Sequence, residues 1–339
     1  MKAAVLHKPA PIEEKPLSID EVPVPAVVKG QVLIKVGACG VCRSNLHMIE
    51  GDWLVHGLPS KLPIIPGHEL VGRVAEVGEG AEPVAIGDVV GVQPLWSSCG
   101  KCEFCLTGRE ELCKTKNITG ETVDGGYAEY MVADAKHVYP VPPNLSDSEA
   151  APLFCAGLTA YSAVKKAELS PIKRVAVFGV GGVGHMVLQF AKIYGAEVVA
   201  VSRGEKHLKV AEELGASLIV DSSKVDPVEE LKKIGGVDSS IVFAPSSAVV
   251  EQALKATKAN GTIVVGVWAG ISQFPFAEEK RLVGTAIGPR QTMREVLRLA
   301  GAGKIKPVID EYKLEDANDV LNMLKQREVR ARAVLVLPK

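Results

Sequence analysis

Residues 174–184 read RVAVFGVGGVG, and this stretch decides the fold of the chain. Its first five residues are mostly apolar and predict a buried strand, while the apolar run that continues to Tyr194 predicts a helix. Between them, three glycines have the spacing G-x-G-x-x-G: Gly179, Gly181 and Gly184. A strand, this spacing and a helix together predict a turn that binds the pyrophosphate of a dinucleotide.

Each part of this turn has a physical role. Glycines permit a tight bend, let the backbone approach a pyrophosphate, and allow the helix to pack against the strand. The helix N-terminus favours the anion through its free N–H groups. We therefore predict that the turn, with Gly182 and Val183 in it, binds the cofactor. A glycine-rich turn without a ligand is the alternative.

Strands and helices alternate from about Leu153 onward. Short apolar runs predict strands at residues 197–201, 218–220, 240–244 and 262–267, with helical segments between them. Repeated strand–helix–strand units imply a parallel sheet wrapped by helices through right-handed crossovers. The predicted fold class is therefore α/β, with a doubly wound parallel-sheet domain.

The first 150 residues have a different pattern of apolar and turn-forming residues. Short alternating apolar runs separated by Gly and Pro predict a β-rich domain, with strands at residues 31–36, 72–77 and 88–92. After Pro289 the pattern predicts two helices and a closing strand, at residues 292–302, 314–326 and 331–337. The chain of 339 residues is thus expected to form two domains.

Charge and composition exclude several classes of protein. The 39 Lys and Arg against 40 Asp and Glu argue against a nucleic-acid or polybasic membrane binder. A hydrophobic content of 47% excludes intrinsic disorder. The sequence has neither a secretory leader pattern nor an unbroken apolar segment of spanning length. Seven cysteines in that context favour a reducing compartment, so the expected location is the cytoplasm.

Four of the cysteines form the pattern C-x2-C-x2-C-x7-C: Cys99, Cys102, Cys105 and Cys113. Four crowded thiolates suit tetrahedral Zn²⁺ and leave no open coordination position, which indicates a structural zinc site. An iron–sulfur cluster and four unrelated thiols are the alternatives.

Two further cysteines and a histidine lie at turn-rich places: Cys42, His68 and Cys155. Two thiolates and one imidazole leave a fourth position for water or substrate, as in a catalytic zinc site. Taken singly, each also fits an ordinary role, since small buried cysteines and core histidines are common. The seventh cysteine, Cys39, is interpreted as a core residue.

The order and spacing of these motifs resemble one family along the whole chain. The segments GVCRSNLH (40–47) and GHE (67–69), the Cys quartet and Cys155 are similar to those of the zinc-dependent alcohol dehydrogenases of the medium-chain dehydrogenase/reductase superfamily. The resemblance implies a GroES-like catalytic domain from residues 1–155 and 289–339, with two zinc sites, and a Rossmann domain from residues 156–288. It also implies that Cys42, His68 and Cys155 bind the catalytic zinc.

Two residues beside these ligands are assigned to the second shell of that metal. The family usually has Asp three residues after the first Cys ligand, as an acceptor for the zinc-binding His, whereas this chain has Asn45. We therefore expect Asn45 to hold the imidazole of His68 through a neutral bond, which changes the basicity of the ligand. Glu69 follows the His as in the family and is expected to lie behind the zinc.

The resemblance also implies a proton relay and further contacts. Ser44 matches the hydroxyl that accepts the alcohol proton, and His47 matches the residue that passes it to solvent. Arg43 and Arg332 match cationic positions and are candidate pyrophosphate contacts, with solvated surface roles as the alternative. Trp53 matches a position that lines the alcohol pocket, with simple packing as its alternative.

The strand after the glycine-rich turn indicates which cofactor is used. An NAD-binding Asp or Glu is expected at its end, but the chain reads Ser202-Arg203-Gly204, followed by Lys206. A hydroxyl and two cations can bind a 2′-phosphate, which a carboxylate would repel. This pattern predicts a preference for NADP(H) over NAD(H), with an NAD enzyme that has a relaxed pocket as the alternative.

These observations together predict an NAD(P)-dependent zinc alcohol dehydrogenase with two zinc ions per chain. The expected substrate is a primary or secondary alcohol, and a small Ser44, rather than a bulkier Thr, leaves room for a branched or secondary one. Family members of this length are commonly tetramers rather than dimers. A polyol or amino-alcohol dehydrogenase of the same fold is one alternative. A non-enzymatic, zinc-stapled nucleotide-binding protein is another. The zinc ligands argue against a quinone reductase of the same fold.

Overall fold

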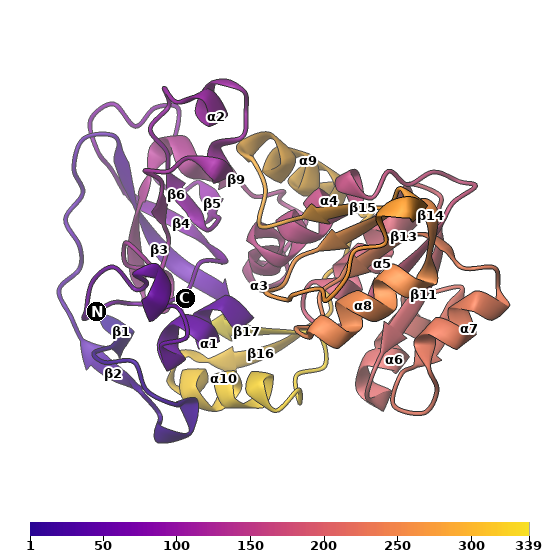
Figure 1. Ribbon diagram of the computed structural model, residues 1–339. Helices are drawn as coiled ribbons and strands as arrows, with labels where there is room; N and C mark the ends of the chain where they lie inside the picture. The colour runs from indigo at the N-terminus through magenta and orange to yellow at the C-terminus, as the bar shows by residue number, and fades with distance from the viewer. Residues whose placement is uncertain (339) are drawn as a thin grey trace. The chain divides into compact units, whose positions relative to one another are not determined.

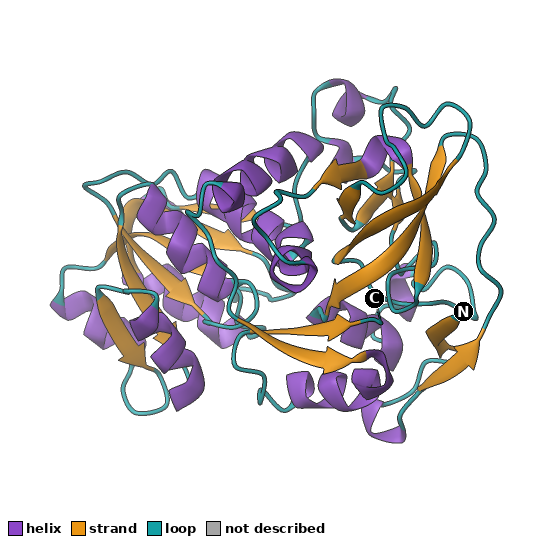
Figure 2. Ribbon diagram, turned by 180° about the vertical axis from the view of Figure 1, so that it is seen from behind, coloured by secondary structure: helices purple, strands orange, loops and turns teal. Residues whose placement is uncertain are grey.

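The computed structural model describes residues 1–338, and the chain divides into two compact units. The first contains Met1–Cys155, Pro289–Gly301 and the described residues from Ile309 onward. The second contains Ala156–Gly288 and Ala302–Val308. Figures 1 and 2 show the two units from opposite sides.

This division differs from the predicted one at residues 302–308, which were assigned to the first domain. Hydrogen bonds to helix α5 (Gly184–Ile193) account for the difference. Gln189 Oε1 accepts from the backbone N–H of Lys306 at 2.9 Å, and His185 Nε2 accepts from that of Val308 at 3.2 Å. These bonds attach the segment to the second unit.

The second unit is a six-stranded sheet in which all neighbouring strands are parallel. Its order is β12 (Leu218–Asp221), β11 (Glu197–Ser202), β10 (Arg174–Phe178), β13 (Val237–Val242), β14 (Thr257–Val265) and β15 (Arg281–Gly284). The chain runs outward from β10 to β12 and then restarts beside β10 at β13. The order therefore reverses between β10 and β13, and such a switch point is where doubly wound sheets bind ligands.

Five helices flank this sheet: α4 (Ala156–Lys166), α5, α6 (Glu205–Glu213), α7 (Pro227–Lys233) and α8 (Ser247–Ala256). Helix α4 packs beside α5, and α7 packs beside α8 (Figure 1). The strands are apolar along most of their length, and Val175, Ala176 and Val177 of β10 are all fully buried. The fold class predicted from the glycine-rich stretch is confirmed.

The first unit is built around a seven-stranded sheet. Its order is β16 (Ile309–Lys313), β17 (Arg332–Val336), β3 (Gln31–Gly40), β4 (Leu70–Val77), β5 (Val89–Val92) and β9 (Val138–Pro140), and β8 (Tyr130–Asp134) also pairs with β3. Strand β3 is longer than the predicted 31–36, because its buried continuation to Gly40 pairs with β17 and β4. The C-terminal strand thus lies against the end of β3, just before Cys42.

Smaller elements complete this unit. Two short hairpin sheets pair β1 (Lys2–Leu6) with β2 (Leu17–Glu21) and β6 (Leu95–Ser97) with β7 (Asn117–Ile118). The helices are α1 (Arg43–Glu50), α2 (Glu103–Leu106), α3 (Asp147–Ala150), α9 (Arg290–Gly301) and α10 (Ala317–Lys325) (Figure 2). The sequence pattern did not predict β1, β2, β15 or β16. Exposed polar residues weaken the apolar periodicity of β2 and β16, while β1 and β15 are short.

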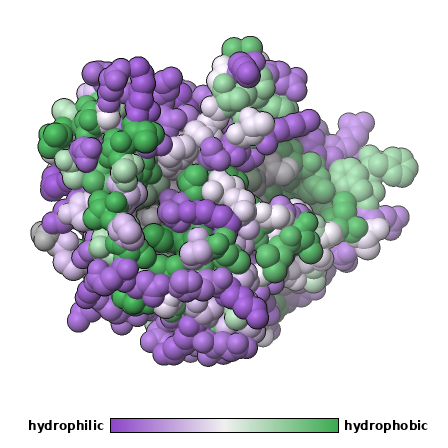
Figure 3. All heavy atoms as spheres, turned by 90° about the vertical axis from the view of Figure 1, so that its left-hand side faces the viewer, coloured by the Kyte–Doolittle hydropathy of each residue, from purple (hydrophilic) through white to green (hydrophobic). Residues whose placement is uncertain are grey.

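The surface carries no single apolar belt on the face that Figure 3 shows. Hydrophobic side chains occur there in several separate groups between hydrophilic ones. Within residues 1–338, every helix is too short or too polar to cross a membrane.

Candidate active site and metal centres

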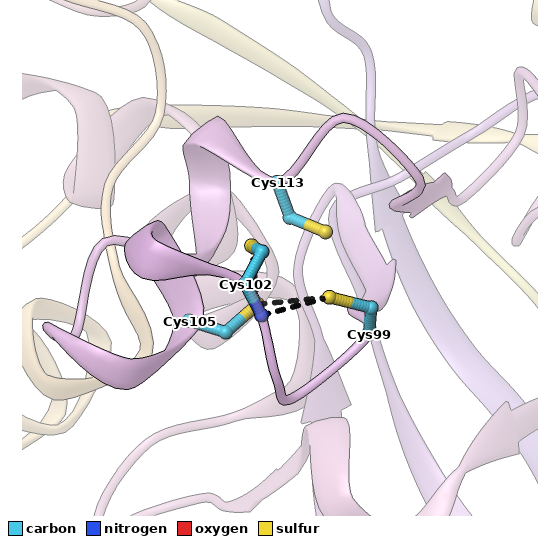
Figure 4. Close-up of side chains that lie close together, drawn as sticks. All are labelled: Cys99, Cys102, Cys105 and Cys113. Atoms are coloured by element: carbon cyan, nitrogen blue, oxygen red, sulfur yellow. Dashed lines mark hydrogen bonds between the residues drawn. The ribbon is translucent and has the colours of Figure 1, made fainter.

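The four clustered cysteines meet on one loop of the first unit. Cys102 begins α2, Cys105 lies within it, and Cys113 follows a short 3-10 helix, while Cys99 precedes the loop (Figure 4). Cys99 Sγ lies 3.9 Å and Cys102 Sγ 3.5 Å from Cys105 Sγ. Four thiolates bound tetrahedrally to Zn²⁺ would have sulfur–sulfur distances of about 3.8 Å. The loop is therefore the right size for a zinc ion.

Backbone amides stabilise two of these thiolates. A hydrogen bond from the Cys99 amide lowers the pKa of Cys113 to about 6, and one from the Lys101 amide lowers the pKa of Cys99. Burial acts in the opposite direction on Cys105 and raises its pKa to about 11. Deprotonated thiols are the form that binds metal, so the loop favours anionic ligands at Cys99 and Cys113 even before a cation is considered.

A second group of ligands comes from three separate segments. Cys42 is the N-cap of α1, His68 lies two residues before β4, and Cys155 lies between a 3-10 helix (Ala151–Phe154) and α4. Their ligating atoms, with a carboxylate oxygen of Glu69, all lie within 4.8 Å of one another. Cys42, His68 and Cys155 are 8%, 2% and 7% exposed, so all three side chains are buried.

Local backbone geometry brings His68 to this position. Gly67 has a positive φ of 98°, and a Cβ there would overlap the ring of Tyr127 and the sulfur of Cys39. Glycine is therefore required at the turn that aims His68 inward. Cys39 is itself fully buried in the core, as predicted, and burial raises its thiol pKa above the usual range.

The charges around Cys42 favour the thiolate. A hydrogen bond with Cys155 holds the pKa of Cys42 well below its ordinary value, and the positive charge of Arg332 acts in the same direction. Arg332 forms a buried, two-point ion pair with Glu69, including an Nε to Oε2 bond of 3.1 Å. Glu69 is thus neutralised by Arg332. The predicted contact between Arg332 and a pyrophosphate stays a prediction, because the described partner of its guanidinium is a carboxylate.

His68 is surrounded by polar groups on both ring nitrogens. Ser44 Oγ lies 3.3 Å from Nε2, and Asn45 Nδ2 lies 3.4 Å from Nδ1. Sequence reasoning missed a further neighbour, Glu121, whose Oε1 is 3.8 Å from Nδ1. Glu121 is 5% exposed, and burial raises its pKa to about 7. No sequence pattern marked Glu121, since it belongs to none of the motifs and lies far from Cys42, His68 and Cys155 in the chain.

His47 is partly exposed and contacts two residues that follow α1. Its Nδ1 is 2.7 Å from Asp52 Oδ2, and its ring stacks on Trp53 at a centroid distance of 6.1 Å. The His47 side chain is 33% exposed. Asp52 was not predicted to matter, but it fixes the orientation of the His47 ring. Trp53 is half-buried and packs partly against the core.

Arg43 lies in the first turn of α1 beside another cation. Its Nη1 donates to the carbonyl of Leu324 at 3.4 Å, while its buried Nε has no hydrogen-bond partner among the described residues. Burial lowers the pKa of Arg43, and the positive charge of Arg327 lowers it further. A bound anion would reduce the repulsion between the two cations and would accept a hydrogen bond from the unsatisfied Nε. Arg327 was not identified from the sequence.

The three glycines of the predicted cofactor turn have different environments. Gly179 has a φ of 96° and, like Gly184, has no room for a side chain. A Cβ on Gly184 would overlap the carbonyl oxygen of Gly179, so the start of α5 packs directly on the turn. A Cβ on Gly181 would meet nothing within 4 Å. The protein itself therefore requires glycine at 179 and 184, whereas Gly181 faces space that a pyrophosphate can fill.

Ser202 lies at the end of β11, beside this turn. It is 7% exposed, and its Oγ accepts a hydrogen bond from the backbone N–H of Val180 at 3.4 Å. Arg203 and Lys206 are exposed just beyond it. The three residues predicted to bind the ribose 2′-phosphate thus lie at or just after the end of β11. Ser202 is buried there, and the two cations are exposed.

Comparison with known proteins gives the same result for both halves of the chain. Residues 28–143 match the family model described as alcohol dehydrogenase GroES-like domain, and residues 182–302 match zinc-binding dehydrogenase. An alcohol dehydrogenase of Geobacillus stearothermophilus is 41% identical over 99% of both chains. These matches define a zinc-binding dehydrogenase. The chain belongs to the zinc-type alcohol dehydrogenases of the medium-chain family, and it is an oxidoreductase.

Solved structures agree with this assignment. The alcohol dehydrogenase of the archaeon Aeropyrum pernix is 36% identical, with a TM-score of 0.91 over 99% of this chain and 100% of that one. A structure described as an NAD-dependent alcohol dehydrogenase is 31% identical, with a TM-score of 0.91 over 100% of both chains. The GroES-like and Rossmann folds implied by the sequence motifs are confirmed.

The cysteine quartet generates a test of its metal role. We predict that Cys113→Ser removes one zinc ion per chain and lowers the thermal unfolding midpoint, because the loop loses the ligand with the most acidic thiol of the set and with it the ion that orders it. Zinc counting by atomic spectroscopy and calorimetry measure the two effects. The matched control is Cys39→Ala, which removes a buried thiol that belongs to neither group of possible zinc ligands. Its zinc content is expected to equal that of the wild type. An unchanged zinc count in Cys113→Ser would contradict the prediction.

The glycine-rich turn generates a second test. Gly184→Ala is expected to destabilise the protein by about 1–3 kcal/mol, because its Cβ would overlap the backbone at Gly179. Gly181→Ala is expected to leave stability unchanged but weaken binding of a dinucleotide, since its methyl group enters the open space. Urea unfolding and cofactor titration followed by fluorescence separate the two variants. Equal cofactor affinity in Gly181→Ala and the wild type would exclude a close approach at this glycine.

Proposed function

We propose that the protein catalyses reversible hydride transfer between a primary or secondary alcohol and NADP(H) at a zinc ion held by Cys42, His68 and Cys155. The observation that carries this proposal is the convergence of these three ligating atoms beside the hydroxyl of Ser44. Two thiolates and an imidazole leave one position for the alcohol oxygen. Glu69, which completes the group, is already paired with Arg332 and is assigned to the surroundings of the metal.

Each group in this site has a distinct part in the reaction. The zinc ion supplies Lewis-acid activation of the alcohol or carbonyl oxygen when it is bound. Ser44 accepts the hydroxyl proton of the alcohol, and His47 delivers that proton to solvent. Asp52 holds the His47 ring at 2.7 Å, so the relay ends on an oriented, partly exposed imidazole. The second zinc, in the Cys99–Cys113 loop, has a structural role.

Cofactor binding is assigned first to the glycine-rich turn, where Gly179, Gly181, Gly182, Val183 and Gly184 are proposed to bind the pyrophosphate. Arg43 and Arg332 stay candidate pyrophosphate contacts. We propose Ser202, Arg203 and Lys206 as the residues that select NADP(H), because no carboxylate stands at the end of β11. The similarity to an NAD-dependent enzyme makes this selection the first point to measure.

Assembly and location are further parts of the proposal. Trp268 and Phe276 are 76% and 84% exposed, and they lie in the segment before the edge strand β15. Exposed aromatics beside an open sheet edge favour contact with another copy of the chain, and we propose a homotetramer. All seven cysteines are free of disulfides, which supports a reducing compartment such as the cytoplasm.

Cofactor choice is tested by kcat/KM for NADP⁺ and NAD⁺, with benzyl alcohol and 2-butanol as substrates. We expect NADP⁺ to be preferred, and Ser202→Asp to shift the ratio toward NAD⁺ by at least about tenfold, because the carboxylate repels the 2′-phosphate. Lys224→Ala, which removes a cation at the neighbouring strand end, is the control and leaves the ratio unchanged. A wild-type preference for NAD⁺ would overturn the assignment of Ser202 and Arg203. Turnover with neither alcohol would favour a polyol or amino alcohol as substrate.

The proposed relay is tested by His47→Gln. We expect kcat to fall by up to about 100-fold while the zinc content is unchanged, because the variant removes the proton carrier and no metal ligand. His56→Gln changes an exposed histidine a few residues along the chain and serves as the control. Stopped-flow measurement of proton release with a pH indicator reports the step directly. Equal proton-release rates in wild type and His47→Gln would exclude His47 from the relay.

A further inference from the structure

We propose that Glu121 is a positioning residue of the metal site and accepts a hydrogen bond from the protonated Nδ1 of His68. The inference rests on the proposed function, because it presumes that Nε2 of His68 binds the zinc ion. It concerns a residue that no sequence motif marked. The argument starts from Asn45, the residue expected to hold the same ring nitrogen.

The hydrogen bonds of Asn45 fix which way its side-chain amide points. Asn45 Oδ1 accepts from the backbone N–H of Cys42 at 3.4 Å and from the hydroxyl of Tyr127 at 3.4 Å. Rotating the amide by 180° would set its NH2 group against the Cys42 N–H, donor against donor. The backbone at the N-terminus of α1 therefore determines the orientation of the Asn45 amide. In this orientation Nδ2 points toward His68.

This orientation conflicts with the tautomer that a metal ligand requires. A neutral imidazole that binds metal through one nitrogen carries its proton on the other. Nε2 is the nitrogen beside Ser44, so the proton of a zinc-binding His68 resides on Nδ1. Nδ1–H would then face the NH2 group of Asn45 at 3.4 Å, again donor against donor. The ring needs an acceptor that Asn45 does not supply.

Glu121 supplies that acceptor. Its Oε1 lies 3.8 Å from Nδ1, and both side chains are almost completely buried, at 6% and 2% exposure. The distance is longer than a hydrogen bond, and closing it takes a shift of roughly 1 Å in a flexible side chain. The backbone of Glu121 is fixed by bonds from its N–H to Ile118 and from Ser60 to its carbonyl, at 3.2 and 3.0 Å. The carboxylate is thus held on the correct side of the ring.

A carboxylate behind a metal-binding histidine fixes the ring and raises its basicity. Loss of such a partner typically weakens metal binding by about 10- to 100-fold. We therefore expect the affinity of the Cys42–His68–Cys155 site to depend on Glu121, while the Cys99–Cys113 site is independent of it. This difference between two sites in one chain gives the test its internal reference.

The experiment measures zinc affinity by competition with a chromophoric chelator, using the full-length protein. Glu121→Met, which keeps the length of the side chain and removes the acceptor, is expected to weaken one of two zinc sites by about 10- to 100-fold. Glu121→Gln, which keeps an acceptor oxygen but loses the charge, is expected to weaken it less. Asp124→Asn is the matched control in the same loop, since its carboxylate binds Lys61 and the Ile65 amide instead. It leaves both affinities unchanged.

A double variant separates positioning from a general loss of structure. Asn45→Asp places a carboxylate oxygen where the NH2 group faces Nδ1, and Asn45→Asp with Glu121→Met is expected to recover most of the lost affinity. Unchanged affinity in both Glu121 variants, or a loss that Asn45→Asp does not restore, would overturn the proposal. Should Glu121→Met fold poorly, the same comparison is made with Glu121→Gln.

The same data distinguish this proposal from the proposed function. Cys42→Ser identifies which zinc belongs to the Cys42 site. A wild-type protein that binds a single zinc, unaffected by Cys42→Ser, would show that the proposed catalytic site fails. Two zinc ions in the wild type with equal affinity in Glu121→Met would leave the proposed function intact and reject the role of Glu121.

Discussion

The buried ion pair between Arg332 and Glu69 is the interaction on which the first unit depends. The two side chains are 3% and 0% exposed and lie 263 positions apart in the chain. Removing one partner of such a pair leaves an uncompensated buried charge and typically costs about 3–5 kcal/mol. The pair therefore stabilises the last strand, β17, in its position beside the end of β3. Because Cys42 lies two residues after the end of β3, strand β17 near the C-terminus helps to position this proposed metal ligand near the start of the chain.

The same pair sets the electrostatics of the candidate active site. Glu69 belongs to the group of possible ligands by distance, but its carboxylate is neutralised by Arg332. The positive charge of Arg332 also lowers the pKa of Cys42, together with the hydrogen bond from Cys155. The site thus favours thiolates while holding the nearby carboxylate in another bond. This arrangement supports the proposal that two cysteines and a histidine, rather than Glu69, hold the zinc ion.

Sequence reasoning succeeded where the signal is local. The glycine spacing with its flanking strand and helix predicted β10, the turn and α5, because backbone constraints at Gly179 and Gly184 act between residues close in the chain. The cysteine quartet lies on one loop for the same reason. Contacts that depend on distant segments were not predictable in this way. The ion pair of Arg332 with Glu69 joins residues 263 positions apart, and the attachment of residues 302–308 to α5 depends on three hydrogen bonds with no sequence pattern.

Asn45 shows how a local match and a distant contact combine at one atom. The sequence indicated that an amide stands beside His68, and the structure has that amide 3.4 Å from Nδ1. What the sequence did not contain was the direction of the amide, which is decided by the Cys42 backbone and by Tyr127, 82 positions away. With its oxygen committed to those donors, Asn45 supports the start of α1 and leaves the imidazole proton to a different group. In the proposed arrangement Glu121, whose Oε1 lies 3.8 Å from Nδ1, is the acceptor for that proton, a role that a single carboxylate at position 45 could also perform.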